Sequence, residues 1–151
     1  MRDFDGDTDT ATLTITGAAD GKPTGITGVD TVDETNLTGG TLTETGNISV
    51  NYNGDGPGTT AGNNSFSASD STLTAGGKPV SVTFSGGTYT GKDSSGKTIF
   101  TMKINSNGTY EFKLYDNLDH PNASNSNDNI ALRFGVTATD SDGDTGTGTV
   151  T

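Results

Sequence analysis

The segment TIFTMKINSNGTYEFKLY, residues 98–115, contains two alternating runs separated by a short polar stretch. The apolar residues of each run fall on one face: Phe100, Met102 and Ile104, then Tyr110, Phe112 and Leu114. A period of two is typical of a β-strand with one buried face. The Asn-Gly pair at residues 107 and 108 supplies the positive φ that a tight hairpin turn needs. The segment therefore predicts a β-hairpin at the heart of the hydrophobic core.

Similar alternation recurs along the rest of the chain. Ile130 to Ala138 alternates over nine residues and predicts a central strand. Further strands are expected at 9–16, 29–33, 37–44, 47–52, 62–71, 80–84 and 145–151. Residues 17–28 and 53–58 are rich in Gly, Pro and Asp and are expected to be loops. No stretch shows helical periodicity, and 23 glycines among 151 residues disfavour helices. The chain is therefore predicted to be an all-β sandwich.

The composition limits the partners that the protein can have. The net charge of −11 disfavours nucleic acid and anionic membrane surfaces, because both bind basic proteins. No apolar run approaches ~18 residues, so direct membrane insertion is not expected. Hydrophobic residues make up only 27% of the chain, and there is no cysteine to form a disulfide. We expect bound metal to supply part of the stability that this small core lacks.

The strongest motif is Asp140-Ser141-Asp142-Gly143-Asp144-Thr145, with a near-copy at residues 3–8. Closely spaced carboxylates around a glycine turn supply the oxygen ligands that Ca²⁺ prefers. The glycine is at position 4 and no Glu stands at position 12, so the motif is not an EF-hand. The predicted calcium ligands are Asp140, Asp142 and Asp144, with Asp3, Asp5 and Asp7 as their equivalents. The alternative is a solvated turn in which Asp only favours turn geometry.

A complete calcium shell needs more oxygens than three Asp residues provide. The candidates for the remaining ligands are Asp33, Glu34, Asp119 and Asp128. We expect their loops to cluster with the motif at one end of the sandwich. For each of these residues, an ordinary surface acid is the alternative interpretation.

Residues 3–14 and 140–151 align without a gap and are identical at eight of twelve positions. The alignment indicates one period of a tandem array. Residues 1–16 are then the closing strand that belongs to a preceding repeat, and residues 17–151 are one β-sandwich repeat. Its partners are expected to be the neighbouring repeats of the same chain, and the protein is otherwise expected to be monomeric.

Six short motifs occur in order along the chain: VDET (32–35), NGDGPG (53–58), LTAGGKPV (73–80), NGTYEFKL (107–114), LDHP (118–121) and ATDSDGDT (138–145). Together they resemble the tandem repeats of giant bacterial RTX adhesins exported by type I secretion. The resemblance implies an Ig-like or cadherin-like Greek-key sandwich stabilised by calcium, and it strengthens Asp33 and Glu34 as ligands. The glycine-rich nonapeptide that gives RTX proteins their name is absent, so the resemblance implies a stalk module.

The expected function is therefore a calcium-binding extender repeat of a secreted bacterial surface adhesin, which projects a distal binding domain for adhesion and biofilm formation. The alternative is a module of such an adhesin that binds a glycan or a peptide. No catalytic residue or enzyme activity is predicted, because the chain lacks GxSxG, HExxH and a Cys nucleophile. The only histidine, His120, precedes Pro121 and is expected to pack or hydrogen-bond locally.

Overall fold

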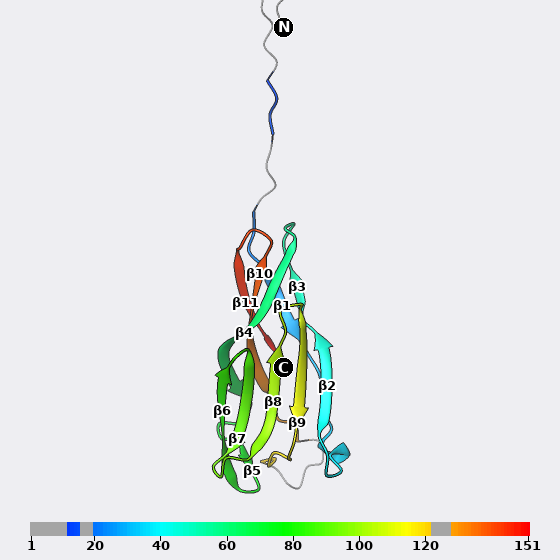
Figure 1. Ribbon diagram of the computed structural model, residues 1–151, viewed down its shortest axis with the longest axis vertical. Coiled ribbons are helices and arrows are strands. Elements are labelled where there is room, and N and C mark those ends of the chain that lie inside the picture. The colour runs from blue at the N-terminus through cyan, green and yellow to red at the C-terminus, as the bar shows by residue number, and fades with distance from the viewer. Residues whose placement is uncertain (1–11, 16–19, 122–127) are drawn as a thin grey trace, which may run out of the picture.

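The computed structural model of the protein describes residues 12–15, 20–121 and 128–151. Two β-sheets pack against each other as a sandwich (Figure 1), which confirms the prediction of an all-β sandwich. The strands are β1 (Thr24–Gly28), β2 (Leu42–Asn47), β3 (Ser49–Asn51), β4 (Pro57–Ala68), β5 (Thr74–Ala75), β6 (Lys78–Ser85), β7 (Thr88–Asp93), β8 (Thr98–Ile104), β9 (Thr109–Leu114), β10 (Leu132–Asp140) and β11 (Thr145–Val150). One sheet has the order β3-β1-β11-β10-β4 and the other β2-β9-β8-β7-β6-β5. A single 3-10 turn, η1 (Glu34–Asn36), is the only helical element among the described residues.

The predicted central hairpin is formed by β8 and β9. Its register pairs Phe100 with Leu114 and Met102 with Phe112, so that the apolar faces of both strands point into the sandwich. All six apolar residues singled out in the sequence are buried. Gly108 has a φ of +81°, as the Asn-Gly turn requires. The hairpin continues a meander in which consecutive strands from β5 to β9 are neighbours.

The other wall of the core is centred on β10, which pairs with β11 on one side and with β4 on the other. Phe134 on β10 is 2% exposed, and its ring lies 5.3 Å from Phe66 and 5.4 Å from Tyr89, measured between ring centroids. Phe100 and Phe112 of the hairpin are 6.0 and 6.2 Å away. Aromatic pairs at these distances add to the free energy gained by burial. Phe134 therefore joins the two sheets.

A buried threonine also links the sheets. The hydroxyl of Thr60 on β4 donates to the carbonyl of Asn105 at 2.5 Å and accepts from the Gly108 amide at 3.0 Å. Its own amide donates to the Ser106 carbonyl. One side chain thus satisfies polar groups of the β8–β9 turn that the sandwich would otherwise leave without partners.

Several predicted boundaries are wrong. The expected loop 17–28 contains β1, which forms a parallel pairing with β11 that no local pattern reveals. The expected loop 53–58 contains the start of β4 at Pro57, which is tolerated because β4 is an edge strand. Gly58 sits so close to the carbonyl of Asp140 that an added Cβ would lie 2.4 Å from it. Residues 29–33 form no strand, and neither do residues 12–15, the described part of the predicted strand 9–16.

The sandwich is elongated, and its two ends carry different loops (Figure 1). The β10–β11 turn, the β3–β4 loop and the residues leading into β1 share one end, which we call the β10–β11 end. η1 and the loop that follows β9 lie at the opposite end, together with β5. This division decides which acidic residues can meet.

Candidate metal centre

Three carboxylates meet at the β10–β11 end of the sandwich. Asp20 lies on the segment that leads into β1, whereas Asp142 and Asp144 lie in the turn between β10 and β11. One carboxylate oxygen from each residue lies within 4.8 Å of the other two, and all three residues are exposed. We call these residues the acidic cluster. The structure thus brings Asp142 and Asp144 close together and adds Asp20, from the segment 17–28 that the sequence predicts to be a loop.

Asp140 shapes the turn that carries two members of the cluster. Its Oδ1 accepts hydrogen bonds from the amides of Gly143 at 3.0 Å and Asp144 at 2.7 Å, and its own amide donates to the Asp144 carbonyl. Gly143 has a φ of +108°, a conformation that favours glycine. Asp140 is only 4% exposed, and its Oδ2 has no hydrogen-bond partner among the described residues. Asp140 therefore positions the turn through one oxygen and leaves the other, buried oxygen unpaired.

The β3–β4 loop forms a third side of this end. The Asp55 Oδ2 accepts from the amide of Gly21 at 3.4 Å, next to Asp20 in the chain. The Gly56 carbonyl accepts from the amide of Ser141 at 2.9 Å, which ties the same loop to the β10–β11 turn. Asp55 therefore brings a further carboxylate to this end, and it comes from a stretch that the sequence predicted to be only a turn.

The negative charges of the acidic cluster lie close enough together to affect one another's protonation. The charge of Asp142 raises the pKa of the Asp20 carboxyl above its ordinary value of 3.8, and a hydrogen-bond contact with Asp142 acts in the same direction. The charges of Asp144 and Asp55 also raise the pKa of Asp20. Like charges at this spacing repel unless a cation lies among them.

The donor set suits a hard divalent cation. Every ligand atom that the cluster offers is a carboxylate oxygen, which is the ligand type of Ca²⁺ and Mg²⁺, whereas zinc and copper sites favour His and Cys. The residues are exposed, so water could complete a coordination shell of six to eight oxygens. Asp142 and Asp144 could therefore contribute to a site for a hard divalent cation, and the assignment to calcium stays a prediction.

Asp33 and Glu34 lie at the opposite end, where they hold loops. The Asp33 Oδ1 accepts from the amide of Thr35 at 3.0 Å and from its hydroxyl at 2.7 Å, which caps η1. These hydrogen bonds, that of the hydroxyl above all, lower the pKa of Asp33. Glu34 accepts from the Leu118 amide at 3.0 Å, and its other oxygen lies 3.3 Å from the Nε2 of His120. Both carboxylates thus have partners within the protein, Asp33 in its own turn and Glu34 in the loop after β9.

Asp119 also lies at that end. Its two carboxylate oxygens accept from the amides of Gly76 at 2.9 Å and Gly77 at 2.7 Å, in the turn between β5 and β6. The hydrogen bond from the Gly77 amide is the largest of the effects that lower the pKa of Asp119. Asp119 therefore fastens the loop after β9 to this turn.

The expectation that these loops gather with the motif at one end is thus wrong. The sheets run the length of the molecule and place η1 and the loop after β9 at the end opposite the β10–β11 turn (Figure 1). Asp128 precedes β10 and is not one of the three residues of the acidic cluster. Asp3, Asp5 and Asp7 lie outside the described residues, so the second copy of the motif stays a prediction.

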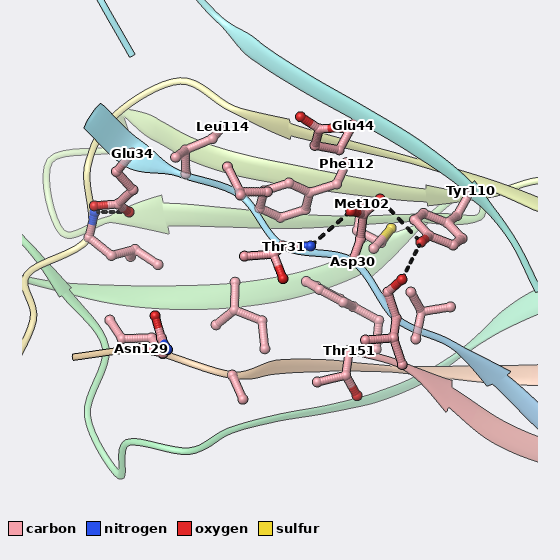
Figure 2. Close-up of a pocket in the computed structure, with 18 of the residues that line it drawn as sticks. Asp30, Thr31, Glu34, Glu44, Met102, Tyr110, Phe112, Leu114, Asn129 and Thr151 are labelled. Carbon is pink, nitrogen blue, oxygen red and sulfur yellow. Dashed lines mark hydrogen bonds between the residues drawn. The ribbon is translucent and has the colours of Figure 1, made fainter. Parts of the chain in front are cut away.

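A pocket opens between the sheets beside Glu34 (Figure 2), and His120 is another of the residues that line it. It has a volume of about 280 Å³. The Nδ1 of His120 is buried without a hydrogen-bond partner among the described residues. The Nε2 of His120 lies 3.3 Å from the Oε2 of Glu34, which is remote in sequence. Figure 2 shows Met102, Phe112 and Leu114 on the wall that the second sheet provides.

Fold and site together define an all-β sandwich with an acidic cluster at the end where the chain leads into its first strand. A family model described as a domain of unknown function, DUF5801, matches residues 30–151, and the chain belongs to this family. No curated protein and no solved structure matches it. In the part of the chain that the structure describes, no helix is long and apolar enough to cross a membrane.

Proposed function

We propose that the chain is a calcium-binding structural repeat that extends the stalk of a secreted bacterial surface adhesin. The observation that carries this proposal is the meeting of Asp20 with Asp142 and Asp144, which joins the segment before β1 to the final turn of the sandwich. A cation bound there would neutralise charges that raise the pKa of Asp20 and would connect two separate parts of the chain.

Calcium is the cation that this site suits best. Magnesium demands near-ideal octahedral geometry and retains several waters, whereas calcium accepts flexible and irregular oxygen shells. The cluster is built from one loop residue and one turn, without a rigid cage. The buried, unpaired Oδ2 of Asp140 lies in the same turn and is a further oxygen that could take part.

The role that follows is mechanical. Asp20 immediately precedes the sandwich, so a cation shared with the β10–β11 turn would restrict the direction in which the preceding residues leave it. The repeated segment at residues 3–14 supports a tandem array, and the motif resemblance supports an adhesin exported by type I secretion to the cell surface. In this proposal the partners are neighbouring repeats, calcium is the only cofactor and the role is not enzymatic.

Thermal unfolding with Ca²⁺ and with EGTA tests the proposal. A ligand at 100 times its Kd adds about 2.7 kcal/mol to stability, which raises the Tm of a chain of this size by about 5–10 °C. Calorimetric titration should detect calcium binding that Asp142→Asn weakens. The control is Asp70→Asn, because Asp70 follows β4 at the far end of that strand from the cluster. An unchanged Tm, or equal calcium affinity for both variants, would refute the proposed site.

A further inference from the structure

The pocket between the sheets has one apolar wall on each side. Met102, Phe112 and Leu114 of the second sheet face Leu132, Phe134 and Val150 of the first. Figure 2 shows Thr151 and Asn129 on the side of the first sheet, across from Phe112. A cavity of about 280 Å³ between apolar walls has room for an aliphatic side chain.

The pairing of β10 shows why the pocket is open. β10 pairs with β4 from Leu132 onward, but it pairs with β11 only from Phe134, opposite Val150. Among the described residues, Leu132 therefore has a strand neighbour on one side only. The Ala131 carbonyl accepts from the Ser69 amide on the β4 side. Because backbone groups alternate along a strand, the N–H and C=O of Leu132 point to the other side, in line with β11.

The burial pattern of β11 shows which residues of a continued strand would face the core. Gly146 and Val150 face inward and are buried, whereas Thr145, Thr147 and Thr149 face outward. The next inward position is therefore two residues after Val150. That position lies beside Leu132, another inward residue of β10, and it opens into the pocket.

The internal repeat indicates which residue would follow Val150 by two positions. Leu13 aligns with Val150 and Thr14 with Thr151, so Ile15 corresponds to the next inward position. Leu13 and Ile15 are 86% and 84% exposed in this chain, although both are large and apolar. Isolated exposed apolar residues are common, but two in strand phase indicate a face that is covered elsewhere.

We propose that the pocket receives the Ile15 side chain of the next repeat, and that the backbone at Ile15 continues β11 along the open edge of β10 at Leu132. The inference rests on the tandem arrangement in the proposed function, but it does not involve calcium. Each sandwich is then completed by residues that precede the following one. The junction between repeats gains an apolar contact in the part of the preceding sandwich that carries η1, away from the acidic cluster.

Adding the tripeptide Ile-Thr-Gly, the sequence of residues 15–17, after Thr151 tests this inference within one chain. The matched control adds Ser-Thr-Gly, which keeps the length and the strand backbone but removes the apolar side chain. Both proteins are unfolded thermally in EGTA. Burial of an isoleucine side chain predicts a Tm about 3–10 °C higher for the Ile-Thr-Gly protein than for the control. Hydrogen exchange at the Leu132 amide should slow as well.

Equal Tm values for the two extended proteins would overturn the assignment of Ile15 to the pocket. Unchanged exchange at Leu132 would overturn the continuation of β11 along β10. Because all measurements are made in EGTA, a failed calcium titration leaves this result intact. A failed extension likewise leaves the calcium measurement intact, so the two proposals are judged separately.

Discussion

Gly148 on β11 has no space for a side chain, although its counterpart in the repeated segment at residues 3–14 is Ala11. A Cβ added to Gly148 would lie 2.0 Å from the carbonyl oxygen of Ile26 on β1 and 2.6 Å from the Ile26 Cβ. Ordinary contacts begin at 3.4 Å. The Gly148→Ala variant therefore needs a displacement of more than 1 Å between the backbones of two neighbouring strands.

The cost of this displacement follows from what holds the two strands. Thr27 pairs with Thr149 beside the clash, so β1 cannot retreat without weakening its pairing with β11. Overpacking a well-packed site costs about 1–3 kcal/mol, and a clash with backbone falls at the upper end. Replacing glycine also lowers the conformational entropy of the unfolded chain, which stabilises the protein by about 0.4–1 kcal/mol and partly offsets this cost. We expect Gly148→Ala to lower the free energy of unfolding by about 2 kcal/mol, which is about 4–8 °C in Tm.

Urea and thermal unfolding followed by circular dichroism in EGTA measure this effect without contributions from metal. The control is Gly40→Ala, because a Cβ there meets nothing within 4 Å and the backbone of Gly40 is not in the left-handed region. Its stability should stay within about 0.5 kcal/mol of the parent. If Gly148→Ala unfolds at the same urea concentration as Gly40→Ala, the close packing of β1 on β11 is wrong.

Three further predictions concern single side chains, all measured in EGTA. Tyr89→Phe should lower stability by about 1–3 kcal/mol, because the buried hydroxyl donates to the Gly135 carbonyl at 2.7 Å and accepts from the Asn63 amide at 3.2 Å; equal urea midpoints would contradict this. Asp140→Ala should destabilise by about 1–3 kcal/mol by removing two turn hydrogen bonds, whereas Asp142→Ala should not destabilise, since it relieves repulsion; the reverse order would refute these roles. The lowered pKa of Asp119 stabilises the fold above its ordinary value of 3.8, and this contribution is lost as the pH falls through the lowered value. Asp119→Asn should therefore flatten the acid side of a stability-pH profile below about pH 4, and an unchanged slope would count against this.

The strands that sequence patterns predicted well are those with one buried face. The β8–β9 hairpin and β10 are recognisable because apolar residues recur at every second position of these segments. β1 was missed because it is short, contains two glycines and is held by a parallel partner far along the chain. The start of β4 was missed because Pro57 and Gly58 are loop residues by composition, and only the proximity of Asp140 explains them.

In the candidate site, too, local sequence patterns predict some residues, whereas others are found only through contacts between distant parts of the chain. The motif at residues 140–145 marked Asp142 and Asp144 as possible ligands, because three carboxylates around a glycine form a local pattern. Asp20 and Asp55 carry no such pattern, since each is a single acid in a polar loop. Their proximity to the motif depends on how the segment before β1 and the β3–β4 loop meet the β10–β11 turn.

By itself, the sequence determined that the protein is an acidic all-β chain with a core hairpin and a carboxylate-rich final turn, because these features depend on neighbouring residues. The role of each carboxylate depends instead on which groups the folded chain places around it. Asp33 and Asp119 accept hydrogen bonds from amides within about 3 Å, whereas Asp20, Asp142 and Asp144 face one another. A carboxylate either caps backbone amides or remains available to a cation according to the groups that the packed sheets place around it, and sequence spacing does not contain that information.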